Sequence, residues 1–109
     1  MKQSVVALGL ASMFAFGATL ADPPVTVNQA GLKFSSKDLE VNKGQTVVFL
    51  NEDTTSHNIT VTDGNGVTVN SGLQPPGTKF EMPFAKAGKY LVTCGIHPKM
   101  RMNIVVKQP

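Results

Sequence analysis

From Val25 onward, hydrophobic and polar residues alternate in short runs that are separated by turn residues. This period of two is typical of strands with one buried face, and no run keeps the period of an amphipathic helix. The runs predict strands at 25–27, 39–41, 46–50, 57–62, 67–70, 78–84, 90–94 and 102–107. Seven to eight strands in so short a chain predict an all-β fold, an antiparallel Greek-key sandwich or barrel.

The beginning of the chain has a different pattern. Lys2 is followed by an almost uninterrupted apolar run, Val5 to Leu20, which ends in small residues before Ala21. A positive start, an apolar segment and a small-residue end are the features of a secretory signal peptide. The run is shorter than the about 20 apolar residues that a membrane span needs. We therefore expect a signal peptide over residues 1–21, export to the periplasm without a membrane span, and a single domain over residues 22–109.

Charge and cysteine content narrow the function further. The chain has 10 Lys and Arg residues against 7 Asp and Glu residues. This excess is small and dispersed, whereas a nucleic-acid-binding domain needs a clustered basic surface, so we expect no nucleic acid partner. A small exported domain is often stabilised by disulfides, but a single cysteine cannot form one internally. The thiol therefore pairs with another molecule, reacts, or binds a metal that stabilises the folded state.

The single cysteine opens a seven-residue segment with a metal-binding character. His97 follows Cys94 by three residues, and Met100 follows His97 by three more. A thiolate, an imidazole and a thioether are soft or borderline donors, which favour copper or another thiophilic metal over calcium or magnesium. Structural zinc sites usually close with four Cys and His ligands, and this chain has one cysteine and two histidines. The turn after Cys94 can return the other two donors to one point.

His57 is the fourth candidate donor, because it is the other histidine of the chain and begins a predicted strand after a polar loop. In an antiparallel sandwich this strand start can lie at the same pole as the strand end that carries Cys94. Two histidines and a thiolate in a plane, with a weak axial methionine, form a blue-copper site. Met102 competes with Met100 for the axial position, since strand alternation points both side chains to similar faces.

Three stretches, in this order along the chain, resemble those of small cupredoxins, the type 1 copper proteins of the plastocyanin, pseudoazurin and amicyanin group. They are Ser56–Val61, Leu73–Gly77 ahead of Phe80, and Gly88–Met100. The short Cys-x-x-His-x-x-Met loop is most similar to that of amicyanins, which favours Met100 over Met102. The resemblance implies a cupredoxin fold and one mononuclear copper ion, cycling between Cu(I) and Cu(II), with the ligands His57, Cys94, His97 and Met100.

Two positions depart from the family pattern. Relatives often carry Ser or Thr directly after the cysteine, hydrogen-bonded to the Asn that follows the first histidine. Here Asn58 is present, but Gly95 has no hydroxyl, and Asn58 can meet backbone groups or Thr93 instead. This departure bears on how the groups behind the ligands set the copper potential. The second is Val92, where many relatives have an aromatic residue, which affects packing more than chemistry.

The leading interpretation is a periplasmic one-electron carrier, and not an enzyme, because four ligands leave no open position for a substrate. We expect a monomer that meets redox partner proteins near His97. Lys99 and Arg101 flank the ligand loop and are either ordinary solvated charges or a docking surface for an acidic partner. Two alternatives stay open: a periplasmic copper-binding protein for copper tolerance or delivery on the same fold, and a copper-free sandwich that binds proteins.

Overall fold

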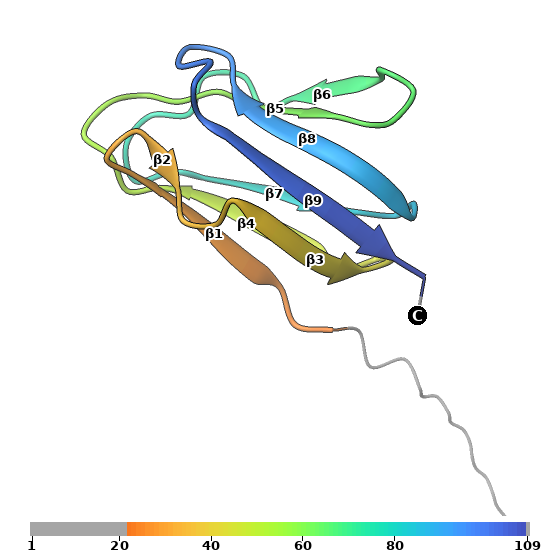
Figure 1. The fold of residues 1–109 in the computed structure, drawn as a ribbon. Coiled ribbons are helices and arrows are strands. Elements are labelled where there is room, and N and C mark those ends of the chain that lie inside the picture. The colour runs from red at the N-terminus through yellow and green to blue at the C-terminus, as the bar shows by residue number, and fades with distance from the viewer. Residues whose placement is uncertain (1–21, 109) are drawn as a thin grey trace, which may run out of the picture.

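The computed structural model describes residues 22–108, so the expected signal peptide at residues 1–21 lies outside the described residues. Nine strands form within the described part of the chain (Figure 1). They are β1 (Val25–Ala30), β2 (Lys33–Phe34), β3 (Asp38–Asn42), β4 (Thr46–Asn51), β5 (Ile59–Thr62), β6 (Thr68–Asn70), β7 (Lys79–Pro83), β8 (Gly88–Cys94) and β9 (Arg101–Lys107). Between residues 22 and 108, no helix is long and apolar enough to cross a membrane.

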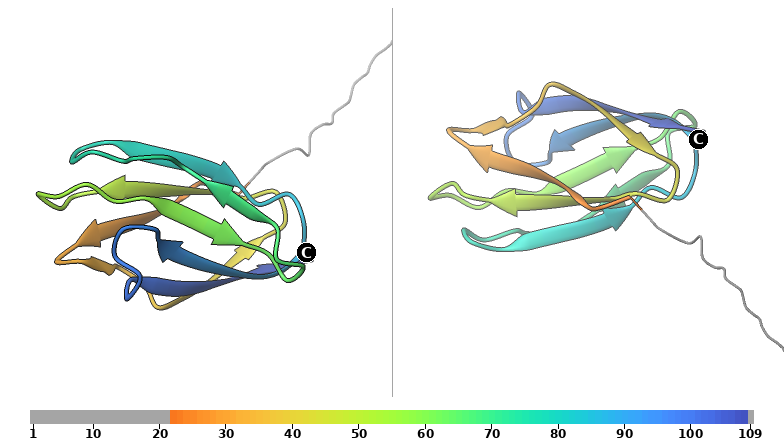
Figure 2. Two further views of the ribbon diagram at one scale, coloured as in Figure 1. Left: turned by 90° about the horizontal axis from the view of Figure 1, so that it is seen from above. Right: turned by 90° about the horizontal axis from the view of Figure 1, so that it is seen from below.

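The strands form two sheets that face each other, as the views from above and below in Figure 2 show. One sheet has the order β2-β1-β4-β7, and the other has the order β3-β9-β8-β5-β6. β8 lies in the middle of the second sheet, with β9 on one side and β5 on the other. The strand that ends at Cys94 is therefore supported along both edges.

The predicted all-β sandwich is confirmed, with two corrections to its details. The structure has nine strands where the sequence predicted seven to eight, because β2 has only two residues and is too short to show an alternating pattern. The sheets are also mixed, since β1 pairs with β4 and β3 pairs with β9 in parallel. Alternation shows which face of a strand is buried but carries no information on the direction of its neighbour.

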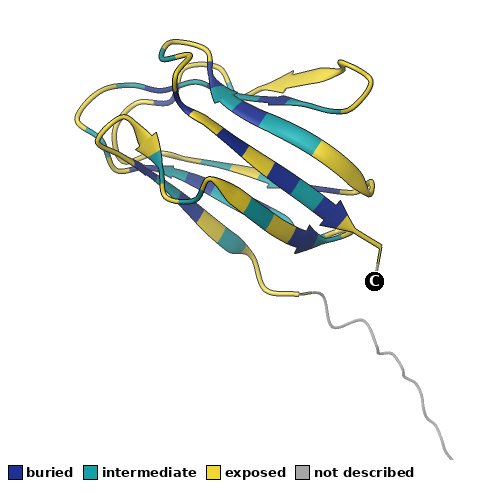
Figure 3. Ribbon diagram, viewed as in Figure 1, coloured by how far each residue is buried: buried dark blue, intermediate teal, exposed yellow. Residues whose placement is uncertain are grey.

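Alternating side chains of the two sheets fill the core between them. Along β4, intermediate and buried positions alternate without a break, and β9 shows stripes of buried and more exposed residues (Figure 3). Met102, the competitor of Met100 for the axial position, is 1% exposed and belongs to the core cluster. The other members are Val27, Val41, Val47, Phe49, Ile59, Val61, Phe84, Val92, Ile104 and Val106. This core fixes the positions of the strands whose ends carry the candidate metal donors.

Candidate metal centre

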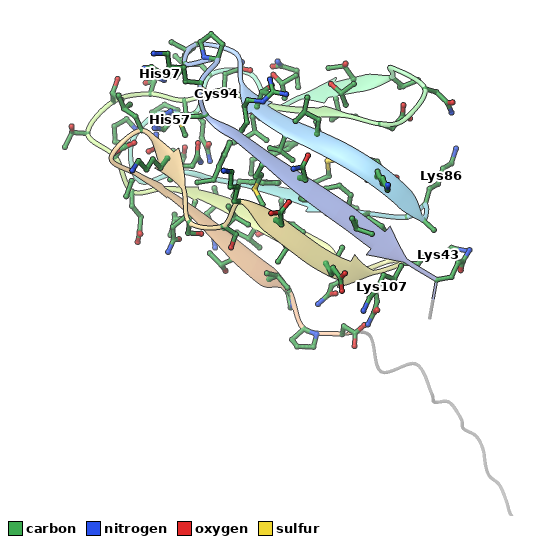
Figure 4. All side chains as sticks on the ribbon, viewed as in Figure 1. Lys43, His57, Lys86, Cys94, His97 and Lys107 are labelled. Atoms are coloured by element: carbon green, nitrogen blue, oxygen red, sulfur yellow. The ribbon has the colours of Figure 1, made fainter. Side chains whose placement is uncertain are left out.

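Three of the four predicted donors meet at one end of the sandwich. The labelled side chains of His57, Cys94 and His97 lie together in Figure 4, at the opposite end from Lys43 and Lys86. Cys94 Sγ is 3.6 Å from His57 Nδ1 and 3.6 Å from His97 Nδ1. The three donor atoms all lie within 4.8 Å of one another. The structure therefore brings together residues that the sequence separates by 37 positions between His57 and Cys94.

The pairing of β5 with β8 produces this meeting. In the antiparallel register, Ile59 is the partner of Cys94, so His57 lies just beyond the end of the ladder. Two further hydrogen bonds extend the contact: the Gly95 N–H donates to the Asn58 carbonyl at 2.9 Å, and the Asn58 N–H donates to Cys94 Sγ at 3.3 Å. The sulfur thus has a backbone donor on one side and two imidazoles nearby.

Gln74 holds the backbone of His57 from the other side. The His57 N–H donates to the Gln74 carbonyl at 2.9 Å, and the Gln74 N–H donates back to the His57 carbonyl at 2.7 Å. The Gln74 side chain accepts a hydrogen bond from Gln29 Nε2 at 2.9 Å and donates to the Phe49 carbonyl at 2.8 Å. Because Gln29 is on β1 and Phe49 on β4, Gln74 connects the segment before β5 to the opposite sheet.

The ring of His57 also contacts a carboxylate that the sequence analysis missed. His57 Nε2 is 2.7 Å from Asp53 Oδ2. When Nε2 carries the hydrogen and donates a hydrogen bond to Asp53, Nδ1 has a free lone pair, which points toward the sulfur of Cys94. A carboxylate behind an imidazole fixes the tautomer and the ring orientation of a metal-binding histidine. The four-residue spacing in an irregular loop has no period that could have revealed this pair.

Backbone groups hold Asp53 in place. Its carboxylate accepts hydrogen bonds from the Gly31 N–H at 2.6 Å and the Leu32 N–H at 3.1 Å. Burial raises the pKa of the Asp53 carboxyl, but the hydrogen bonds from His57, Leu32 and Gly31 outweigh burial and leave the pKa below its ordinary value. The Asp53 N–H donates a further hydrogen bond to Oδ1 of the buried Asn51 at 2.9 Å. A charged acceptor therefore faces the His57 ring.

Met100, the fourth predicted donor, is buried at the end of the same loop. Its side chain is 3% exposed and, unlike Met102, it is not a member of the core cluster. The Met100 N–H donates to the His97 carbonyl at 2.9 Å, and the Met100 carbonyl accepts from the Cys94 N–H at 3.3 Å. These two bonds close the loop between β8 and β9, so the loop is bound to itself as well as to the sheet.

The geometry of the cluster fits a bound transition metal. An ion with bonds of about 2.0 Å to nitrogen and about 2.3 Å to sulfur holds these donors about 3.5–3.7 Å apart, for angles between tetrahedral and trigonal. Both sulfur-to-nitrogen separations of 3.6 Å lie in this interval. A thiolate with two imidazoles also matches the donor preference of copper. The sulfur therefore already lies at a metal-bridging distance from each imidazole nitrogen.

The sequence profile of the family described as copper binding proteins, plastocyanin/azurin family, matches residues 21–107. The match includes the three clustered residues and nearly all of the residues that the structure describes. The chain belongs to this family. Its members are copper-binding electron carriers and not enzymes, so copper is the cofactor of this cupredoxin. His57, Cys94 and His97 form a potential site for it.

Two proteins of known name are similar to this chain in sequence. The methylamine utilization protein MauL of Methylophilus methylotrophus is 37% identical to this cupredoxin over 76 residues, which are 68% of this chain and 44% of MauL. The amicyanin of Paracoccus denitrificans is 32% identical over 94 residues, which are 83% of this chain and 70% of amicyanin. The cupredoxin therefore spans less than half of that MauL but more than two thirds of that amicyanin.

Solved structures agree with this assignment. A reduced variant of amicyanin superposes with a TM-score of 0.72 at 28% identity, covering 83% of this chain and 88% of the variant. A purple cupredoxin from Nitrosopumilus maritimus superposes with a TM-score of 0.68 at 28% identity, covering 76% of this chain and 99% of that protein. The amicyanin-like resemblance that the sequence motifs indicated is confirmed.

The contact between Asp53 and His57 predicts a role in copper binding. Replacing Asp53 with Ala removes the acceptor that orients the His57 ring, and we expect copper affinity to fall about 10–100-fold. Competition with a copper chelator of known affinity measures this loss. Glu52→Ala is the matched control, because it removes the neighbouring carboxylate, which is exposed. An equal loss in both variants would show that charge alone, and not orientation of the ring, explains the effect.

Proposed function

We propose that this cupredoxin is exported to the periplasm and carries single electrons between partner proteins on one copper ion bound by His57, Cys94, His97 and Met100. The observation that supports this most strongly is the pair of 3.6 Å separations between Cys94 Sγ and the two Nδ1 atoms. Copper supplies the one-electron change between Cu(I) and Cu(II). Residues 1–21 support export, because they begin with a positively charged residue, Lys2, and continue as an apolar run.

The protein supports rapid electron transfer by holding the donors still. Cu(II) and Cu(I) prefer different geometries, and a site with two imidazoles, one thiolate and a weak axial donor is a compromise between them. Cys94 is fixed by the β5–β8 register, and His57 is fixed by Gln74 and Asp53. A donor set that is held in place in this way changes little when the oxidation state changes.

The burial of the donors favours a carrier over a copper tolerance or delivery protein. His57 is 0% exposed, Cys94 is 1% exposed and Met100 is 3% exposed. A protein that hands over copper needs donors that another molecule can reach, whereas an electron carrier keeps its metal. His97 is only partly buried, so we assign the passage of electrons to the edge of its ring.

The surface around His97 suits the docking of a redox partner. A cleft of about 340 Å³ is lined by His97, Met100, Lys99 and Pro98 together with two exposed apolar side chains, Leu32 and Ile96. An adjoining cleft also reaches Met100 and Lys99, and its charged lining residues are all basic: Lys33, Lys37, Lys99 and Arg101. An apolar contact beside a basic rim fits a partner with an acidic rim around its own electron port.

Copper loading tests the ligand assignment. With copper, the protein is expected to show an intense visible thiolate-to-Cu(II) absorption and a reversible potential, and Cys94→Ser is expected to abolish the absorption. Met100→Leu is expected to keep the colour and raise the potential by about 59 mV or more, a tenfold shift in the ratio of Cu(I) to Cu(II). Met102→Leu is the matched control, because Met102 lies in the core. An absorption band that survives in Cys94→Ser would refute the assignment.

Electron transfer to small oxidants of opposite charge tests the basic rim. In the double variant Lys99→Ala/Arg101→Ala, we expect oxidation by anionic hexacyanoferrate(III) to slow about tenfold at low ionic strength. Oxidation by cationic tris(phenanthroline)cobalt(III) is not expected to slow. Lys43→Ala/Lys86→Ala removes the same charge from the far end of the molecule and serves as the control (Figure 4). Equal slowing by both pairs would show that net charge, and not this surface, steers the encounter.

A further inference from the structure

Two asparagine side chains connect the segment beside Cys94 to the outermost strand of the sheet. Asn58 Nδ2 donates to Asn70 Oδ1 at 3.1 Å, and Asn70 Nδ2 donates back to Asn58 Oδ1 at 2.8 Å. Asn70 is the last residue of β6, which lies at the edge of the five-stranded sheet beside β5 (Figure 1). We refer to this reciprocal pair of amides as the Asn58–Asn70 clasp.

Neighbouring groups fix the clasp in one geometry. Asn70 Nδ2 also donates to Thr60 Oγ1 at 3.0 Å, and Asn70 Oδ1 also accepts from the Gly72 N–H at 2.7 Å. Thr60 Oγ1 in turn donates to Asn58 Oδ1 at 2.9 Å. Asn70 is exposed, yet both polar atoms of its side chain have two partners. An exposed amide with this many bonds is held far more firmly than an ordinary surface side chain.

The clasp holds Asn58 against Gly95. A Cβ atom added to Gly95 would lie 2.7 Å from Asn58 Oδ1 and 3.2 Å from Asn58 Cγ, so a side chain at this position requires Asn58 to move. Gly95 is not among the glycines with positive φ, and its backbone conformation is therefore open to other residues. Glycine is required here for space. The Asn58 side chain bonds Asn70 and Thr60, and not Thr93 as the sequence analysis had allowed.

The same asparagine contacts the thiol through its backbone. The Asn58 N–H donates to Cys94 Sγ at 3.3 Å, and its carbonyl accepts from the Gly95 N–H at 2.9 Å. We propose that Asn70 is a positioning residue for the copper site, because it holds Asn58 in the place where its N–H reaches the sulfur of Cys94. This inference rests on the proposed function, since the sulfur is the assigned copper ligand.

The consequence for the copper site follows from the chemistry of the thiolate. A hydrogen bond to the sulfur withdraws electron density that would otherwise stabilise Cu(II), and hydrogen bonding around this sulfur tunes the potential of such sites. When the clasp opens, the N–H···S bond weakens and Cu(II) is favoured. Asn70 therefore raises the potential of the site through Asn58, although its side-chain hydrogen bonds go to Asn58, Thr60 and Gly72 and not to a metal donor.

Asn70→Ala removes the clasp at an exposed position. In the copper-free protein, hydrogen exchange of the Asn58 amide is expected to become about tenfold faster, because this amide opens locally more often. In the copper-loaded protein, the ratio of Cu(II) to Cu(I) at a fixed mediator potential is expected to rise about fivefold, the effect of weakening one hydrogen bond. Asn65→Ala is the matched control, since Asn65 lies in the exposed turn before β6. It is expected to change neither quantity.

Gly95→Ala provides a second, independent test of the Asn58–Asn70 clasp. In the wild-type background the added methyl group opposes the clasp, so this substitution is expected to lower the melting temperature of the copper-free protein and to lower the potential. In the Asn70→Ala background, Asn58 can yield, and the same substitution is expected to have a clearly smaller effect on both. Additive effects of the two substitutions, or unchanged exchange and potential in Asn70→Ala, would overturn the proposal. The exchange and melting measurements need no copper, so they remain decisive even if the ligand assignment fails.

Discussion

Ile59 of β5 pairs with Cys94 of β8, and this register determines where the imidazole of His57 meets the thiol. A slip of one residue would turn Cys94 to the other face of the sheet and separate the donors. The register is fixed by buried side chains on both strands, among them Val61 and Val92, which are also paired partners. The same two strands therefore carry core residues and a metal donor, so apolar packing between the sheets sets the geometry of the site.

Around this pairing, the structure divides the two histidines into different roles. His57 is fully buried, and Asp53 and Gln74 hold its ring and backbone. His97 comes from the loop between β8 and β9, is only partly buried, and lines a cleft with apolar and basic neighbours. An electron carrier needs donors that are held rigidly and a ligand that a partner can approach. His57 meets the first requirement and His97 meets the second.

The sequence predicted the strands with strict alternation, such as β4 and β9, and it predicted the donors Cys94 and His97, because their spacing has a direct chemical meaning. It did not predict β2, the parallel pairings, or the bond between Asp53 and His57, since short strands, strand direction and irregular loops leave no periodic pattern. The missing hydroxyl at Gly95 was visible in the sequence. Asn70, rather than a hydroxyl at position 95, bonds the side chain of Asn58. This bond depends on the β5–β6 register, which cannot be read from the sequence.

We propose that one copper ion is held by two imidazole nitrogens and one thiolate sulfur, all at the end of the β5–β8 pairing where Ile59 meets Cys94. X-ray absorption at the copper edge, recorded on the loaded protein and on its His57→Ala variant, identifies the atoms bound to the ion. We expect a short copper–sulfur distance with two nitrogen neighbours in the loaded protein, and the loss of one nitrogen in the variant. A shell of nitrogen and oxygen alone, or a shell that is identical in both proteins, would contradict it.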